Sequence, residues 1–104
     1  MPQKKIAGKT VDVDANGYMT DMGQWDRNIA QALSKEVDIN MLTDRHWAVI
    51  EYIRQQHKAG ALLSIRSMGK SGVVDTKEFY ELFPGGPLKK ATLIAGVPKP
   101  ASCI

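Results

Sequence analysis

The sequence predicts a mainly α-helical fold: a small orthogonal helical bundle with an N-terminal β-ribbon and an extended C-terminal arm. Three observations support this prediction. Apolar residues recur at helical spacing in segments 24–35 and 43–60. Apolar and polar residues alternate over 10–14, as they do in a half-buried strand. The end of the chain, residues 97–104, is rich in proline, which disfavours helix and predicts an extended arm.

Composition indicates one soluble domain covering residues 1–104. Apolar residues make up 43% of the chain, enough for one modest core, and charged residues make up 24%. The formal net charge of +3 permits an anionic partner without requiring one. A single cysteine excludes an intrachain disulfide and indicates a reducing compartment. With no apolar leader at the N-terminus and no apolar run near the ~20 residues that cross a bilayer, we expect a cytoplasmic protein away from membranes.

Short strands are expected over residues 3–20. Gly8 and the pair Asn16-Gly17 are turn signals, because these residues tolerate a positive φ. The pattern predicts a hairpin or a three-stranded ribbon. Such a ribbon is unstable alone, so it must lie against the helices.

The first two helices are predicted from apolar stripes and capping residues. Asp21 is the candidate cap of a helix over about 24–35. Its apolar face comprises Trp25, Ile29, Ala32 and Leu33. Thr43 caps the second helix and Gly60 closes it. Its stripe contains Trp47, which we expect at the centre of the core, together with Ile50, Ile53 and Arg54.

Three shorter helices are expected in the second half of the chain. A helix is predicted over 62–70, and Asp75 opens a capping box that starts the next one. The pair Pro84-Gly85 ends that fourth helix. A fifth helix is predicted over 88–95, with Gly96 as its C-terminal stop.

The third and fourth helices together resemble a helix-turn-helix in outline, which raises the hypothesis of nucleic-acid binding. The second helix of the pair is acidic, however, with Asp75, Glu78 and Glu81 against Lys77. Phosphate repulsion opposes docking of such a helix in a major groove. Two packed helices without a nucleic-acid role are therefore the favoured interpretation.

The lone cysteine, Cys103, is the principal candidate for chemistry. A thiol on a terminal arm could accept a group and hand it over, because reactivity depends on access as well as on the pKa. The alternative is an incidental cysteine on a frayed end. The terminal carboxylate disfavours the thiolate, so a cation is needed nearby. Lys99 is one candidate, and Arg66 with Lys70 is another, although these two taken alone are typical of a solvated helix face.

The remaining polar residues do not suggest a catalytic site. His46 and His57 lie too far apart on one helix to bind one metal ion together. His46 could act as an acid or base, but an ordinary polar helix residue is the favoured interpretation. No Ser/His/Asp arrangement and no phosphate-binding loop is present, so we expect neither a cofactor nor a metal site.

The C-terminal motif resembles that of a known family. The segments 82–87 and 94–100, followed by the penultimate Cys103, are similar to the signature of the DsrC/TusE family of small sulfur-carrier proteins, which includes the gamma subunit of dissimilatory sulfite reductase. The similarity extends over nearly the whole chain. It implies a helical fold with a C-terminal arm whose cysteine carries sulfur as a persulfide. It also implies that Arg66, and less directly Lys70, hold the arm or stabilise the anionic sulfur.

Two departures from the family pattern narrow the expected function. Thr92 stands where two-cysteine members have their second cysteine, so the chain resembles the single-cysteine TusE-like members that relay sulfur toward tRNA thiolation. Leu63 stands where many members have proline. The leading hypothesis is a sulfurtransferase-type carrier that works with a sulfur donor and an acceptor. The alternatives are a partner of sulfite reductase or a sulfur-oxidising complex, a nucleic-acid-binding regulator, and a homodimer linked through Cys103.

Overall fold

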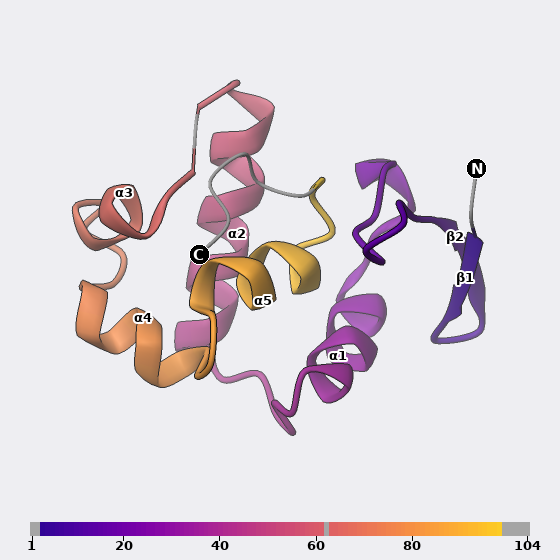
Figure 1. Ribbon diagram of the computed structural model, residues 1–104, viewed down its shortest axis with the longest axis horizontal. Coiled ribbons are helices and arrows are strands. Elements are labelled where there is room, and N and C mark those ends of the chain that lie inside the picture. Colours follow the sequence, from indigo (N-terminus) through magenta and orange to yellow (C-terminus); the bar gives the residue numbers. More distant parts are fainter. Residues whose placement is uncertain (1–2, 62, 99–104) are drawn as a thin grey trace.

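The computed structural model describes residues 3–61 and 63–98, which form a mainly helical domain with a small N-terminal sheet (Figure 1). The elements in this part of the chain are β1 (Gln3–Ile6), β2 (Lys9–Asp12), the 3-10 helix η1 (Met22–Gln24), α1 (Arg27–Glu36), α2 (Asp44–Lys58), α3 (Ile65–Gly69), α4 (Thr76–Leu82) and α5 (Pro87–Ile94). The predicted fold class is confirmed.

The N-terminal ribbon is an antiparallel hairpin that packs on the first helix. Ile6 is paired with Lys9, and the turn between them has positive φ at Ala7 and Gly8 (51° and 81°). A single bridge between Val13 and Met19 follows the hairpin. The predicted hairpin is therefore confirmed, and the contact between β1 and α1 supplies the support that an isolated two-stranded ribbon lacks.

Helix α5 lies at the centre of the domain, where it contacts α1, α2 and α4 (Figure 1). An eight-residue helix is too short to be stable alone in water, so packing must hold it. Its side chains Leu88, Ala91 and Ile94 are completely buried. The C-terminal end of α5 therefore lies in the interior of the protein.

The first helix begins later than the sequence predicts. Asp21 accepts a hydrogen bond from the backbone N–H of Gly23 (2.9 Å) and so caps η1 instead of α1. Trp25 has an extended backbone and separates η1 from α1. The cap of α1 is Asp26, which accepts from the N–H of Ile29 (2.9 Å). Trp25 therefore lies outside the helix whose apolar face was predicted to include it.

The third helix is also shorter than predicted. The structure shows α3 over Ile65–Gly69 in place of 62–70. Ser64 and Ser67 form a reciprocal capping box, with both backbone-to-hydroxyl hydrogen bonds at 3.0 Å, and this fixes the helix start. Residue 62 lies outside the described residues.

Trp47 does not occupy the centre of the core. It is half-buried, and the guanidinium of Arg27 lies 4.6 Å above its ring. The centre is filled by smaller aliphatic residues of the same helix, including Ile50 and Ile53, together with the rings of Phe79 and Phe83. Trp47 sits at the edge of the stripe, where one face of its ring stacks on a cation.

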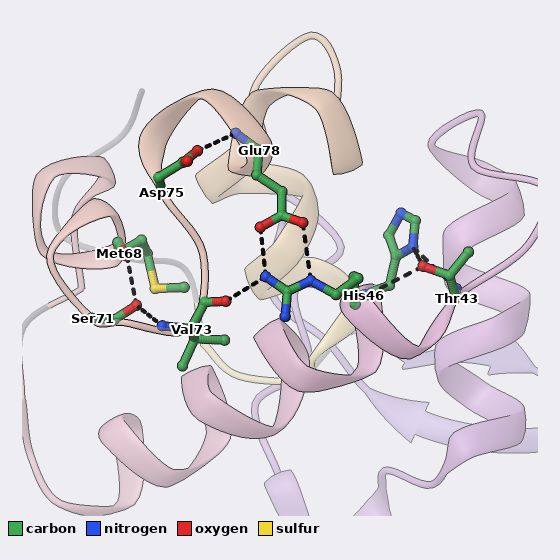
Figure 2. Close-up of polar contacts among 8 residues, drawn as sticks. Thr43, His46, Met68, Ser71, Val73, Asp75 and Glu78 are labelled. Carbon is green, nitrogen blue, oxygen red and sulfur yellow. Dashed lines mark hydrogen bonds and ion pairs between the residues drawn. The ribbon is translucent and has the colours of Figure 1, made fainter.

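An ion pair joins α2 to the start of α4 (Figure 2). Asp75 caps α4, as predicted, by accepting from the N–H of Glu78 (2.7 Å). The Glu78 carboxylate, however, accepts two hydrogen bonds from Arg45 (2.9 and 2.6 Å), which also donates to the carbonyl of Val73 (2.7 Å). The hydrogen bond from Arg45 lowers the pKa of Glu78. The negative charge of Glu78, one of the acidic residues of the helix-turn-helix-like unit, is therefore balanced by Arg45.

His46 is a buried structural residue that joins the start of α2 to the end of α4. Its ring lies beside Thr43 (Figure 2), and Nδ1 accepts from the Thr43 N–H (3.1 Å). Since a carbonyl oxygen can only accept, Nε2 must donate to Leu82 (2.8 Å). The ring also meets Phe83 edge-on at 5.1 Å. These partners give His46 a structural role within the fold, in agreement with the favoured interpretation that it is not an acid or base.

Replacing His46 with leucine should destabilise the domain. The substitution keeps a large side chain but removes the hydrogen bonds to the Leu82 carbonyl and from the Thr43 N–H, and each such bond contributes about 0.5–1.5 kcal/mol. Urea unfolding monitored by circular dichroism would measure the loss. His57→Leu, at a half-buried position on the same helix, is the matched control and should change stability by no more than about 0.5 kcal/mol. Equal losses in the two variants would contradict the assignment.

Candidate functional site

Residues 94–97, at the C-terminal end of α5, form several hydrogen bonds with the rest of the domain. We call this segment the arm root. The N–H of Gly96 donates to the carbonyl of Leu93 (3.2 Å) and the N–H of Val97 donates to that of Thr92 (3.3 Å). This pair of bonds, with Gly96 at φ 69°, is a Schellman motif. Gly96 therefore ends the helix as the sequence predicts, and Val97 is buried with 1% of its surface exposed.

Two side chains from distant parts of the chain complete the arm root. The indole N–H of Trp25 donates to the carbonyl of Ile94 (2.8 Å), and Nη1 of Arg54 donates to that of Ala95 (2.7 Å). A helix leaves its last carbonyls without intrahelical partners. Here the two N–H groups of the Schellman motif and these two side chains satisfy all four carbonyls from 92 to 95.

The guanidinium of Arg54 connects three segments at the arm root. Besides the bond to Ala95, its Nη2 donates to the carbonyl of Met22 (3.1 Å), and its Cζ lies 4.1 Å above the ring of Trp25. Partial burial lowers the pKa of Arg54, while the charge of Glu51 opposes that shift. Arginine keeps its charge in proteins, and a cation at a helix C-terminus interacts favourably with the helix dipole.

The close approach of Trp25 leaves room for no side chain at residue 96. A Cβ placed on Gly96 would lie 2.3 Å from Cδ1 of Trp25 and 2.8 Å from its Cγ. Glycine is thus required here twice, for its positive φ and for the contact with the indole ring. The arm root is consequently held by both Trp25 and Arg54.

Arg66 and Lys70, two of the predicted site residues, do not lie at the arm root. Arg66 lies on α3 and Lys70 is its C-cap; both are exposed. Within the part of the chain that the structure describes, neither side chain forms a hydrogen bond or an ion pair, and Figure 1 shows α3 well separated from the end of α5. Cys103 and Lys99, on which the proposed chemistry depends, lie outside the described residues.

Thr92 is completely buried on the inner face of α5. Its hydroxyl donates to the carbonyl of Leu88 (2.7 Å) and lies 3.1 Å from that of Lys89. A side chain at this position is therefore enclosed by the core. Leu63, the other departure from the family pattern, is half-buried and packs against the same core.

Over residues 3–61 and 63–98, no three His, Cys, Asp or Glu side chains are placed to hold a metal ion. No helix in these ranges is both long and apolar enough to cross a bilayer.

Comparison with known proteins establishes the family. The model of the DsrC-like proteins, "DsrC like protein", matches residues 5–104, and the chain belongs to this family. The chain is 38% identical over 105 residues to the sulfurtransferase TusE of Photorhabdus laumondii, covering 93% of this chain and 94% of that protein. It is 32% identical to the sulfurtransferase TusE of Escherichia coli strain K12, with 93% and 95% covered.

Solved structures of related proteins share the fold. The crystal structure of dissimilatory sulfite reductase I (DsrI) matches with a TM-score of 0.85 and 30% identity, covering 99% of this chain and 100% of that one. The oxidized gamma subunit of the dissimilatory sulfite reductase (DsrC) from Archaeoglobus fulgidus matches with a TM-score of 0.78 and 33% identity, over the same shares. The resemblance inferred from the C-terminal motif is confirmed.

Gly96→Ala should destabilise the protein more than alanine at another glycine of positive φ. The substitution imposes both backbone strain and the clash with Trp25, and overpacking alone costs about 1–3 kcal/mol. Gly72→Ala is the matched control, because Gly72 has φ 82° and nothing within 4 Å of an added Cβ. Thermal unfolding of both variants measures the difference, and equal shifts in the midpoint would refute the close contact.

A cysteine introduced at Thr92 should be shielded from solvent. In a Cys103→Ser background, the thiol of Thr92→Cys should react with iodoacetamide only through local opening, about a hundredfold or more slower than an exposed thiol. Lys89→Cys in the same background supplies that exposed reference, since Lys89 lies on the outer face of the same helix. Comparable alkylation rates would show that residue 92 is accessible.

Proposed function

We propose that this chain is a cytoplasmic sulfur carrier that holds sulfane sulfur as a persulfide on Cys103 and passes it to an acceptor protein. The observation that carries the proposal is that the family match over residues 5–104 includes the only thiol of the chain. The relatives named sulfurtransferase align along more than nine-tenths of this chain, which supports the same activity here. A lone cysteine also suits a reducing compartment.

The proposed chemistry is thiol exchange and requires no built pocket. The Cys103 thiolate attacks the outer sulfur of a donor persulfide, the donor S–S bond breaks, and the donor leaves as a thiolate. Cys103 then carries the sulfur as a persulfide and delivers it to an acceptor thiolate by the same exchange, with no net oxidation. Access to one sulfur atom is the main requirement of this exchange.

Thr92 favours a TusE-like relay toward tRNA thiolation over the two-cysteine chemistry of the family. With a threonine at this position and a single cysteine in the sequence, no intramolecular disulfide can close. The carrier must therefore exchange sulfur with separate donor and acceptor proteins.

A second candidate function is that of a partner of sulfite reductase, favoured by the fold similarity to the gamma subunit of the dissimilatory enzyme. In this role Cys103 would form mixed disulfides with another chain, or with a second copy of this one. Thr92 weighs against the version that needs two cysteines. Co-purification of the tagged protein with reductase subunits would support this candidate.

Sulfur loading can be tested by intact-mass spectrometry. After incubation with glutathione persulfide and removal of the excess reagent, the wild-type protein should gain one sulfur atom, and Cys103→Ser should gain none. A dithiothreitol wash should remove the added sulfur, as expected for a persulfide. Absence of an adduct on the wild type, or an equal adduct on the variant, would contradict the proposed function.

Arg66 and Lys70 are proposed to stabilise the anionic sulfur, and the same assay tests this role. Loss of a nearby cation should disfavour the thiolate, so Arg66→Gln should load more slowly than the wild type at neutral pH. Arg27→Gln removes an exposed arginine from another helix and is the matched control. Equal loading rates for the two variants would remove Arg66 from the site.

A further inference from the structure

The strongest unassigned feature of the domain is the contact of Arg54 and Trp25 with the arm root. We propose that Arg54, acting together with Trp25 through the backbone of Ala95 and Ile94, is a positioning residue that sets the direction in which the cysteine-bearing end of the chain leaves the domain. The reason why the direction would matter rests on the proposed function. The contacts of Arg54 and Trp25 do not depend on it.

The geometry of Arg54 suits a positioning role. Its guanidinium donates through Nη1 to Ala95 and through Nη2 to Met22, and it stacks at 4.1 Å on the indole that binds the preceding carbonyl. A rigid planar fork can hold three segments in one arrangement, whereas the single ammonium group of lysine cannot reproduce the stacking and both bonds. Arg54 itself is anchored on α2, a fifteen-residue helix.

Because this contact lies close in sequence to Cys103, a small change in it could displace the thiol by a large distance. Val97, two residues after Ala95, is still buried, so the contact of Arg54 and Trp25 lies at the end of the described part of the chain. The six residues from 98 to Cys103 can span at most about 20–22 Å when fully extended. A tilt of about 20° at the arm root would displace a thiol about 20 Å away by about 7 Å. A partner with a narrow site for the sulfur would be sensitive to that displacement.

The protein contains a second arginine–tryptophan stack, which provides a matched control. Arg27 lies 4.6 Å above the ring of Trp47, but its side chain is two-thirds exposed and its carboxylate neighbour, Glu51, is 4.0 Å away. This pair joins α1 to α2 without a hydrogen bond to the arm root. Making the same substitutions at both pairs therefore distinguishes the effect of losing an arginine–tryptophan stack from the effect of losing the contact with the arm root.

The test uses Cys103 as the attachment point for a nitroxide spin label, since the chain has no other cysteine. Paramagnetic relaxation enhancement of the backbone amides then reports where the arm lies. In the wild type the enhancement should be confined to one region of the surface. Arg54→Lys and Trp25→Phe should lose that confinement and spread a weaker enhancement over more amides, while Arg27→Lys and Trp47→Phe should keep the wild-type pattern.

The outcomes separate this inference from the proposed function. An even enhancement in the wild type, an unchanged pattern in both arm-root variants, or an equal change in the controls would overturn the positioning role, whatever the sulfur chemistry. Amide spectra verify that each variant is folded, and if Arg54→Lys does not fold, Trp25→Phe carries the test because it removes one hydrogen bond and keeps an aromatic ring. Glutathione persulfide is a small donor that does not require a particular orientation of the arm. The rate at which it loads the arm-root variants should therefore stay within about twofold of the wild-type rate. Failure of the wild type to load would reject the proposed function and leave the positioning result intact.

Discussion

The structure depends on the pairing of four backbone carbonyls at the end of α5. This helix lies against α1, α2 and α4, and Ala95 at its end is completely buried. A buried carbonyl without a donor costs about 1–3 kcal/mol. The chain provides two donors from its own backbone, at Gly96 and Val97, and two from side chains, Trp25 and Arg54. Because these side chains come from the segment before α1 and from α2, the pairing also fixes how those elements lie against α5.

The same constraint holds together the described part of the domain, which precedes Cys103 in the sequence. Each described element is held by caps or by packing, and His46 and Arg45 tie α2 to the second half of the chain. The arm root lies near the end of this part of the domain, and Cys103 follows it in sequence. A carrier that works by thiol exchange needs a defined base for its arm and an accessible sulfur atom, and it needs no pocket of its own.

Local signals in the sequence predict most of the fold. Thr43 and Asp75 mark helix starts and Gly96 marks a helix end, because capping depends on residues close in sequence. The first helix was misplaced because two aspartates, at 21 and 26, compete as caps. Trp47 was misplaced because periodicity identifies a stripe but does not say which of its members lies at the edge.

The candidate site was predictable only in part. Thr92 is recognisable from the C-terminal motif and Gly96 from its position after a helix, whereas Cys103 stays a prediction because it lies outside the described residues. The roles of Trp25 and Arg54 were not, because their hydrogen bonds join residues 69 and 41 positions apart. Periodicity placed both residues in helical stripes, and no local pattern shows that two stripes converge on one helix end. The signal that could have drawn attention to Arg54 is a charged residue within an otherwise apolar stripe.

Amide hydrogen exchange at the arm root tests the central claim most directly. The N–H groups of Gly96 and Val97 are bonded to carbonyls of α5 and lie in buried residues. If the arm root is part of the folded core, both amides should exchange as slowly as those in the middle of α5, through the same opening of the domain. Exchange of these two amides at the rate of an unstructured chain, while the rest of α5 stays protected, would show that the helix end is frayed and would contradict the account.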